Sequence, residues 1–315
     1  GGTISMSESK GSDSGVLPVY SGKELLEILP PLNENIEMDI FDYGMLPSPH
    51  INLKKMLEIK NIITDRWDDF DGFVITHGTD TLEETAYFLD ITLPQGKPVI
   101  LTAAMRSGNE LGLDGPRNLY SSIRVAANKY SGGHKVMVVL NDEIFDARTV
   151  TKIDTSNISS FSSLYMGILG IVDQDSVHFY RSRDHYEHYE IDKITEKIPV
   201  FKIYAGCDSE YINHAVDHSV PGIVIEALGR GNVPPTVVPG IENAVRNNIP
   251  VLVVSRAYQG RVLDIYGYAG GGKKLKEMGC IFGGSLSGQK GRIKLSVLLS
   301  SGIKKDHLKD CFIHD

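Results

Sequence analysis

Three stretches of the sequence carry hydroxyl, carboxylate and ammonium groups that could act together. Thr3 lies in GGTI, Thr79 and Asp80 lie in THGTDT, and Lys152 lies in ARTVTKIDTSN. A threonine hydroxyl is a poor nucleophile at neutral pH until a base removes its proton. A lysine can be that base when burial lowers its pKa or when a neighbour relays the proton. A carboxylate can orient the lysine or hold a substrate ammonium group.

A glycine precedes each of the two threonines, at Gly2 and Gly78. Because glycine has no side chain, the backbone can come close to a ligand there and leave N–H groups available. Such donors stabilise an oxyanion in acyl transfer. The combination of threonine, lysine and aspartate therefore predicts acyl transfer or amide hydrolysis.

Each of these residues also has an ordinary structural interpretation. Thr79 and Asp80 are residue types that cap helices, Thr3 suits a turn, and Lys152 suits a solvated surface. His77 is either a catalytic base or a histidine at a strand end that is bonded to backbone. Spacing along the chain does not show that these groups meet in space.

The elements that must position these residues can be predicted from the apolar pattern. The run GFVIT precedes the second stretch, and PVILTAA and KVMVVL are similar strand-like runs. Leu82, Ala86 and Leu89 share one helix face, and Asp80 with Glu83 resembles a capping pair. Apolar strands that alternate with helices predict a parallel sheet covered on both faces. Ligands gather outside the carboxyl ends of such strands.

The alternation continues on both sides of a charged stretch. The segment GPRNLYSSIRVAANK predicts a helix with Pro116 near its start. After the charged stretch, VFKIYAG, GIVIEAL and PVLVVS predict strands, and VVPGIENAVRNN and GQKGRIKLSVLLSSG predict helices. We therefore predict an α/β protein with a larger N-terminal doubly wound sheet domain (residues 1–182), a linker (183–199) and a smaller C-terminal three-layer α/β domain with a parallel sheet (200–315).

Composition narrows the classes of function. The 315 residues are 41% hydrophobic and 23% charged, which is typical of a globular protein. The net charge of −8 disfavours a nucleic-acid partner. No apolar run is long enough to predict a membrane span. The three cysteines, Cys207, Cys280 and Cys311, are far apart, which predicts reduced thiols. No metal-ligand spacing is present and AGGGKK lacks the Walker spacing, so we expect no metal and no cofactor. Because a strand normally leads into a turn such as GGT, we expect further residues before Gly1.

Taken together, these segments resemble the bacterial L-asparaginases, and type I (the cytosolic kind) more than type II. GGTI resembles the first threonine motif of the family, DGFVITHGTDTLEETA its second signature, and LTAAMRSGNELGLDGPRNL its Ala-Met-Arg segment. DARTVTK resembles the segment that carries the family lysine, and GRGNVP, PVLVVSRAYQGRV and YGYAGGG resemble signatures of the C-terminal domain. The resemblance covers nearly the whole chain.

The resemblance implies a role for each catalytic candidate. Thr3 would attack the side-chain amide carbon of L-asparagine, and Thr79, Lys152 and Asp80 would move protons. Asp80 would also meet the substrate α-ammonium group, and the N–H groups of Thr3 and Thr79 would hold the oxyanion. Attack would yield an acyl-enzyme and ammonia, and water would then release L-aspartate. Which threonine attacks first has been argued both ways in the family.

The resemblance also implies a substrate pocket. Ser48, in LPSPHI, matches the serine that holds the α-carboxylate, and the Gly78 backbone and the Ala104 carbonyl would line the pocket. Pro49 departs from the family, in which type II enzymes carry glutamine and many type I enzymes serine. Proline has no N–H to donate, so we expect an altered pocket shape.

Two other regions depart from the family pattern. The lid, SMSESKGSDSGVLPVYSG, has Val16 where type I relatives carry tyrosine, and Tyr20 is the candidate substitute or else a plain loop residue. We expect this lid to move on binding. Asn232 matches a residue that reaches the site of a neighbouring subunit, or it is a turn residue before a proline. Gly272 stands near the position where type II enzymes supply an acidic residue to the neighbour.

The resemblance implies a cytoplasmic homotetramer, a dimer of dimers, that acts on a small molecule and contacts neither nucleic acid nor membrane. Two alternatives remain at this point: the glutaminase subunit of a tRNA-dependent amidotransferase, and a non-catalytic amino-acid sensor. The affinity for asparagine, the activity on glutamine and any regulation by a second effector site stay open.

Overall fold

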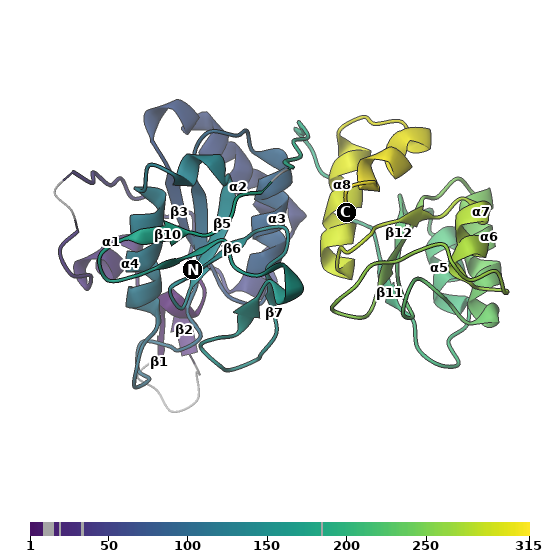
Figure 1. The fold of residues 1–315 in the computed structure, drawn as a ribbon, viewed down its shortest axis with the longest axis horizontal. Helices are drawn as coiled ribbons and strands as arrows, with labels where there is room; N and C mark the ends of the chain where they lie inside the picture. Colours follow the sequence, from purple (N-terminus) through teal and green to yellow (C-terminus); the bar gives the residue numbers. More distant parts are fainter. Residues whose placement is uncertain (9–15, 19, 33–34, 184) are drawn as a thin grey trace. The chain divides into compact units, whose positions relative to one another are not determined.

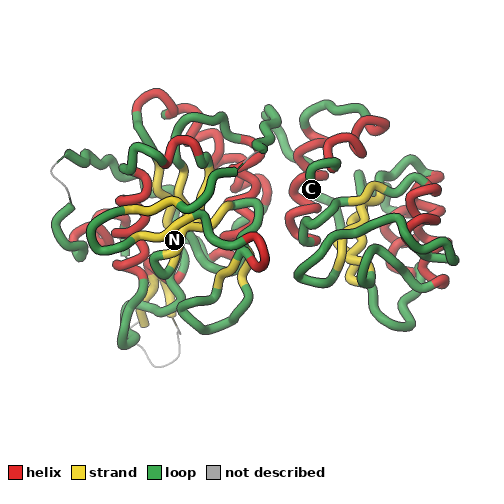
Figure 2. Tube along the Cα trace, in the orientation of Figure 1, coloured by secondary structure: helices red, strands yellow, loops and turns green. Residues whose placement is uncertain are grey.

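The computed structural model describes residues 1–8, 16–18, 20–32, 35–183 and 185–315. The chain divides into two compact units, Gly1–His188 and Tyr189–Asp315, and the division falls inside the stretch expected to link the domains. In each unit the strands lie at the centre with helices around them (Figure 2). Within the described residues, no helix is both long enough and apolar enough to cross a lipid bilayer.

The first unit is built on a six-stranded sheet. Its strands lie side by side in the order β10 (Val177–Phe179), β9 (Gly170–Val172), β6 (Glu143–Asp146), β5 (Val136–Leu140), β4 (Val99–Thr102) and β3 (Phe73–Thr76). Strands β3, β4 and β5 are parallel, as predicted, whereas β6, β9 and β10 run antiparallel to their neighbours. The three strands predicted from the sequence in this unit are the parallel ones, and β6, β9 and β10 lie in a part of the chain for which no strand was predicted.

The change to antiparallel pairing has a local cause. Leu140 pairs with Glu143, so that only Asn141 and Asp142 connect β5 to β6. Both connecting residues have positive φ, 51° and 60°, which is the geometry of the tight hairpin turn that matches strand twist. The dipeptide Asn-Asp is a turn signal, and it reverses the chain directly after β5.

Helices cover both faces of this sheet, in agreement with the predicted doubly wound architecture. Helix α4 (Gly115–Ala126), with Pro116 in its first turn as predicted, packs on one face, and α3 (Leu82–Thr92) packs on the other (Figure 1). Leu82, Ala86 and Leu89 are fully buried, which confirms the predicted helix face. The unit also contains α1 (Gly22–Glu27), α2 (Leu53–Asp65) and two small hairpins, β1–β2 (Met6–Glu8, Val16–Pro18) and β7–β8 (Thr151–Lys152, Phe161–Ser162).

The second unit is a three-layer parallel α/β structure, as predicted. Its sheet has the order β11 (Val200–Lys202), β12 (Ile223–Ala227), β13 (Val251–Ser255) and β14 (Ile281–Phe282), and all neighbours are parallel. The helices are α5 (Glu210–Asp217), α6 (Val238–Arg246), α7 (Gly272–Met278) and α8 (Gly288–Ser300). Helices α5 and α6 share a hydrophobic core with the central strands β12 and β13. Helix α8 packs closely on β13, where Gly291 contacts Leu252 and Val254. The cysteines are free, and Cys207 and Cys280 are buried.

Candidate active site

The loop between β3 and α3 carries Thr79 and Asp80 at the carboxyl end of a parallel strand. The expected capping pair of Asp80 and Glu83 is not formed, because α3 begins at Leu82 with Thr81 as its N-cap, and that cap makes no side-chain hydrogen bond to the helix. The cap interpretation of Thr79 and Asp80 is therefore wrong. Both side chains are available for other contacts.

Lys152 makes those contacts. Its Nζ donates a hydrogen bond to Thr79 Oγ1 at 2.9 Å and to Asp80 Oδ1 at 2.7 Å. The Lys152 side chain is only 16% exposed, whereas that of Asp80 is 60% exposed. The surface-lysine interpretation of Lys152 is therefore wrong. The amine bridges a hydroxyl and a carboxylate that lie more than seventy residues away in the sequence, an arrangement that can pass a proton between them.

Thr3 reaches the same region because two glycine backbones touch. A Cβ placed on Gly2 would lie 2.2 Å from Gly78 Cα and 2.5 Å from His77 O. Gly2 also has a φ of 76°, which disfavours any side chain there. Thr3 and Thr79 therefore each follow a glycine at a point where the two chain segments are in contact, as the Gly-Thr pairs led us to expect.

The hydroxyl and amide groups of this contact are free to meet a ligand. Within the described residues, the Thr3 hydroxyl has no hydrogen-bond partner, and the N–H groups of Thr3 and Thr79 have no acceptor. Free N–H donors beside a hydroxyl are what an oxyanion site requires. The geometry thus offers a nucleophile, a proton carrier and two donors at one place.

Ser48 closes the other side of the loop. Its hydroxyl accepts a hydrogen bond from Asp80 N at 3.2 Å, and its carbonyl accepts one from the Thr81 hydroxyl at 2.8 Å. A Cβ on Gly78 would lie 2.8 Å from both Ser48 Cβ and Ser48 Oγ, so only glycine fits there. Ser48 begins a short 3-10 helix with Pro49 as its second residue, where the missing N–H costs no helical bond.

His77 is a structural residue. Its Nδ1 lies 2.8 Å from Gly78 O, so this nitrogen carries the proton, and Nε2 lies 3.0 Å from Thr85 Oγ1, whose hydroxyl donates to it. Burial lowers the pKa of His77 to about 4, against a smaller raising effect of the Gly78 carbonyl. The imidazole is therefore neutral at pH 7 with both nitrogens occupied, and it holds the backbone of the loop. Of the two interpretations left open from the sequence, the strand-end histidine is confirmed.

The segment after β4 is held by a residue that the sequence did not reveal. Asp114 accepts hydrogen bonds from Met105 N at 2.9 Å and Arg106 N at 3.0 Å, and from the Asn118 side chain at 3.2 Å. Ala104, expected to line the pocket, is fully buried immediately before these two amides. Asp114 occupies the N-cap position of α4, and that position in the pattern DGPRN was the available signal.

Tyr20 lies beside the Ala-Met-Arg segment. Its ring packs on Gly108, whose Cβ would lie 3.0 Å from a ring carbon and 3.4 Å from the hydroxyl oxygen. Among the described residues Tyr20 makes no side-chain hydrogen bond to Thr3, and the residue is 37% exposed. Residues 9–15 and 19 of the expected lid lie outside the described residues, and so does the side chain of Val16.

Asn232 and Gly272 belong to the second unit and are close to each other. The Asn232 side chain accepts a hydrogen bond from Gly272 N at 3.2 Å, and its backbone pairs with Leu228 in a tight turn. A Cβ on Gly272 would lie 2.6 Å from Leu263 O. Position 272 therefore has no room for an acidic side chain, and Asn232 has a structural task at the start of α7.

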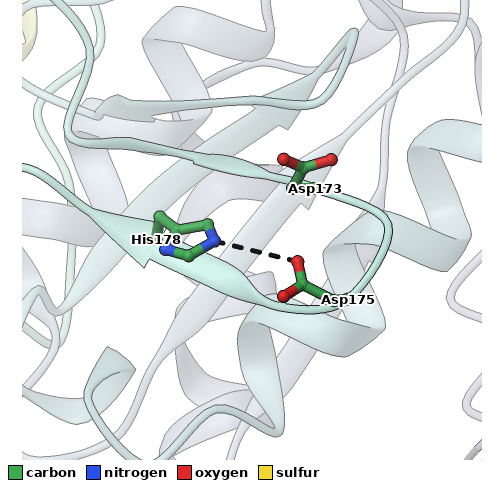
Figure 3. Close-up of side chains that lie close together, drawn as sticks. All are labelled: Asp173, Asp175 and His178. Carbon is green, nitrogen blue, oxygen red and sulfur yellow. Dashed lines mark ion pairs between the residues drawn. The ribbon is translucent and has the colours of Figure 1, made fainter.

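One group of side chains in the first unit has the composition of a cation site. Asp173, Asp175 and His178 extend from the hairpin of β9 and β10, with ligand atoms within 4.8 Å of one another (Figure 3). All three are exposed, and His178 Nε2 is 3.9 Å from Asp175 and 2.8 Å from the Ser176 hydroxyl. Exposed acidic groups on a turn commonly gather in this way, and no buried polar group points to a ligand here. We assign no metal to this cluster.

Known proteins resemble this chain over its whole length. Residues 1–185 match the family model described as Asparaginase, N-terminal, and residues 197–312 match Glutaminase/Asparaginase C-terminal domain. An L-asparaginase of Bacillus licheniformis is 37% identical, over 100% of this chain and 97% of that protein. A probable L-asparaginase of Deinococcus radiodurans is 36% identical, over 94% of this chain and 92% of that protein. The solved structure of a probable cytoplasmic L-asparaginase from Campylobacter jejuni has a TM-score of 0.88 and 27% identity, over 99% of this chain and 96% of that one.

Proposed function

The chain belongs to the asparaginase family, and we propose that it is an L-asparagine amidohydrolase, which converts L-asparagine and water to L-aspartate and ammonia. The observation that carries the proposal is the contact of Lys152 with both Thr79 and Asp80 beside the Gly2–Gly78 contact. An amide hydrolase needs a nucleophile, a proton carrier and an oxyanion site in one place, and these residues supply all three.

In the proposed mechanism the Thr3 hydroxyl attacks the side-chain amide carbon of asparagine. The group of Thr79 and Lys152 accepts the hydroxyl proton and delivers it to the departing nitrogen, so that ammonia leaves and an ester to Thr3 remains. Water then attacks the ester by the same route and releases aspartate. The N–H groups of Thr3 and Thr79, which have no acceptor within the described residues, favour this oxyanion site.

The recognition of the amino-acid end is assigned to the opposite side of the loop. We propose that the Asp80 carboxylate meets the substrate α-ammonium group and that the Ser48 hydroxyl holds the α-carboxylate. The hydrogen bond from Asp80 N to Ser48 Oγ supports this pairing, because it keeps the two recognition groups adjacent. Gly78 and the Ala104 carbonyl would complete the lining, and Tyr20 is the candidate lid hydroxyl.

We further propose a type I enzyme that works in the cytoplasm as a homotetramer. The likeness to a probable cytoplasmic L-asparaginase supports the compartment. Asn232 is the candidate residue to approach a neighbouring site, and the absence of space at Gly272 argues against the acidic contribution of type II enzymes. Neither the amidotransferase subunit nor the sensor is favoured, because the relatives are L-asparaginases and each motif threonine and the lysine is present.

Ammonia release by the purified protein tests the proposed function. We expect rapid release from L-asparagine and much slower release from L-glutamine, with Thr3→Ala as the inactive control. Glutamine hydrolysis that requires a partner protein and tRNA would instead support the amidotransferase subunit. Calorimetric binding of asparagine or aspartate without turnover by the wild-type protein would instead support the sensor.

A further inference from the structure

A buried group of charges lies away from the site, at the other end of α3. Arg183 Nη1 donates to Asp90 Oδ2 at 2.7 Å and to Asp146 Oδ1 at 3.2 Å. The three side chains are 8%, 0% and 6% exposed, respectively. Lys135 adds a second positive charge that acts on Asp90, and its Nζ donates to Glu187 O at 2.7 Å. Two aspartates are thus balanced by an arginine and a lysine.

The two aspartates belong to the two segments that carry the catalytic groups. Asp90 is near the end of α3, the helix that begins directly after the loop of Thr79 and Asp80. Asp146 ends β6, and the chain continues through a turn to Lys152. Arg183 is therefore one residue that contacts both of the segments whose side chains must meet.

The segment of Lys152 needs such a link, because it does not belong to the main sheet. In the part of the chain that the structure describes, β7 pairs with β8 alone, in a separate two-stranded sheet. The turn before it is organised by Asp146, whose carbonyl accepts from Thr149 N and Val150 N and whose Oδ1 accepts from Arg148 N. The same carboxylate oxygen receives Arg183, so the arginine fixes the root of the lysine segment to α3.

The stability of the fold does not explain this arrangement. Asp90 Oδ1 and Arg183 Nε have no hydrogen-bond partner within the described residues, and both are buried. A buried ion pair with incomplete hydrogen bonding is often no more stable than an apolar replacement. Its specific effect is to define one relative position of the elements that it joins.

We infer that Arg183 is a positioning residue for amide hydrolysis: by bridging Asp90 and Asp146, it holds Lys152 within hydrogen-bond reach of Thr79 and Asp80. This inference rests on the proposed function for its kinetic readout and on the fold alone for its structural readout. Displacement of a catalytic group by about an ångström can cost about a hundredfold in rate. Loss of the Arg183 bridge should therefore lower turnover rather than weaken the binding of asparagine.

The test removes the bridge while keeping the buried charge balanced. The double variant Arg183→Met, Asp146→Asn loses one positive and one negative charge, leaves Asp90 beside Lys135, and keeps an oxygen that can accept from Arg148 N. Burial lowers the pKa of Lys135 to about 8, so at pH 7 its amine carries the positive charge that faces Asp90. We expect kcat for asparagine to fall by at least about tenfold while KM changes by less than about threefold, since misplacement acts on the chemical step.

Arg181→Met is the matched control. Arg181 lies on the same segment, and within the described residues its guanidinium donates to the carbonyls of Ile168 and Gly167. Its loss should leave kcat within about twofold of wild type, as expected of a side chain that joins neither catalytic segment. The single variant Arg183→Lys keeps a cation between the two carboxylates and should retain most of the wild-type kcat. If the double variant does not fold, Asp146→Asn alone weakens the same link and should give an intermediate kcat.

Hydrogen exchange gives the readout that does not depend on activity. We expect faster exchange in residues 147–153 of the double variant than in wild type or Arg181→Met. A folded double variant with kcat near wild type and unchanged exchange in residues 147–153 would overturn the inference. So would an equal loss of kcat in Arg181→Met. A wild-type protein without asparaginase activity would contradict the proposed function, and the exchange experiment would still decide whether Arg183 holds the lysine segment.

Discussion

Gly2 and Gly78 are in backbone contact, because a Cβ on Gly2 would fall 2.2 Å from Gly78 Cα and 2.4 Å from Gly78 N. Each glycine is followed by one of the two motif threonines. The contact explains why the first motif has glycine at position 2, because a side chain there would force the two segments apart. A side chain at Gly78 would instead meet Ser48. The spacing of the two hydroxyls is therefore set by main chain, which cannot shift as a side chain can.

Gly2→Ala should abolish this contact. We expect at least about a hundredfold loss of kcat/KM, because the displacement acts on the nucleophile itself. The free energy of unfolding should fall by more than about 2 kcal/mol, from the clash and the left-handed backbone together. Enzyme kinetics and denaturant unfolding measure the two effects.

Gly167→Ala provides the control for the backbone conformation. Gly167 has a φ of 72°, close to the 76° of Gly2, but nothing lies within 4 Å of its Cβ position. The free energy of unfolding of Gly167→Ala should fall only by the cost of the strained backbone, about 1–2 kcal/mol, and the variant should keep its activity. Equal behaviour of the two variants would show that the contact of the glycines is unimportant.

Thr79→Ala and Lys152→Met should each reduce kcat by a factor of order 10⁴, as the loss of one member of a catalytic group does. Because the two residues are proposed to transfer the same proton, the double variant should be no slower than about the slower of the two single variants. Rate losses that multiply in the double variant would show that Thr79 and Lys152 act independently.

Much of this site could be predicted from the sequence, and what could not be predicted has physical reasons. The strands and helices follow from apolar periodicity, and the Gly-Thr pairs already indicated a close approach of backbone. The meeting of Lys152 with Thr79 joins residues far apart in the chain, which local patterns do not encode. Only the resemblance to a family indicated it.

Arg183 shows the same limit more sharply. It lies in a charged stretch that is typical of a solvated linker, and an unpaired arginine would indeed be costly to bury. The carboxylates of Asp90 and Asp146, brought from two distant elements, reverse that expectation. A run of charged residues predicts exposed side chains only where the tertiary structure places no oppositely charged group beside them.

Asp114→Asn should loosen the segment that presents the Ala104 carbonyl. An amide has one acceptor oxygen in place of two, so one of the bonds to Met105 N and Arg106 N is lost. A hydrogen bond to a charged group contributes about 1.5–3 kcal/mol, and we expect KM for asparagine to rise by about tenfold with a smaller change in kcat. Glu110→Gln is the control, because this exposed carboxylate accepts from Ser107 on the same segment. A kcat effect without a KM effect would assign Asp114 to the chemical step instead.

The lowered pKa of His77 predicts that the free energy of unfolding decreases in acid. In the folded protein its pKa is lowered to about 4 from 6.5, so between these values the unfolded chain binds a proton that the folded chain does not. The stability that the neutral imidazole contributes is therefore complete above pH 6.5 and is lost as the pH falls towards 4. The full shift corresponds to about 3 kcal/mol.

His77→Gln isolates this contribution from that of the carboxylates. Glutamine offers an oxygen that can accept from the Thr85 hydroxyl and has no proton to gain in this range. Denaturant unfolding between pH 7 and pH 4.5 should show a steeper loss of stability for wild type than for His77→Gln, whereas His178→Gln, a substitution of an exposed histidine, should retain the wild-type slope. Parallel pH dependence in wild type and His77→Gln would mean that burial does not hold the imidazole neutral, and Nε2 would then donate to Thr85 Oγ1 instead of accepting from it.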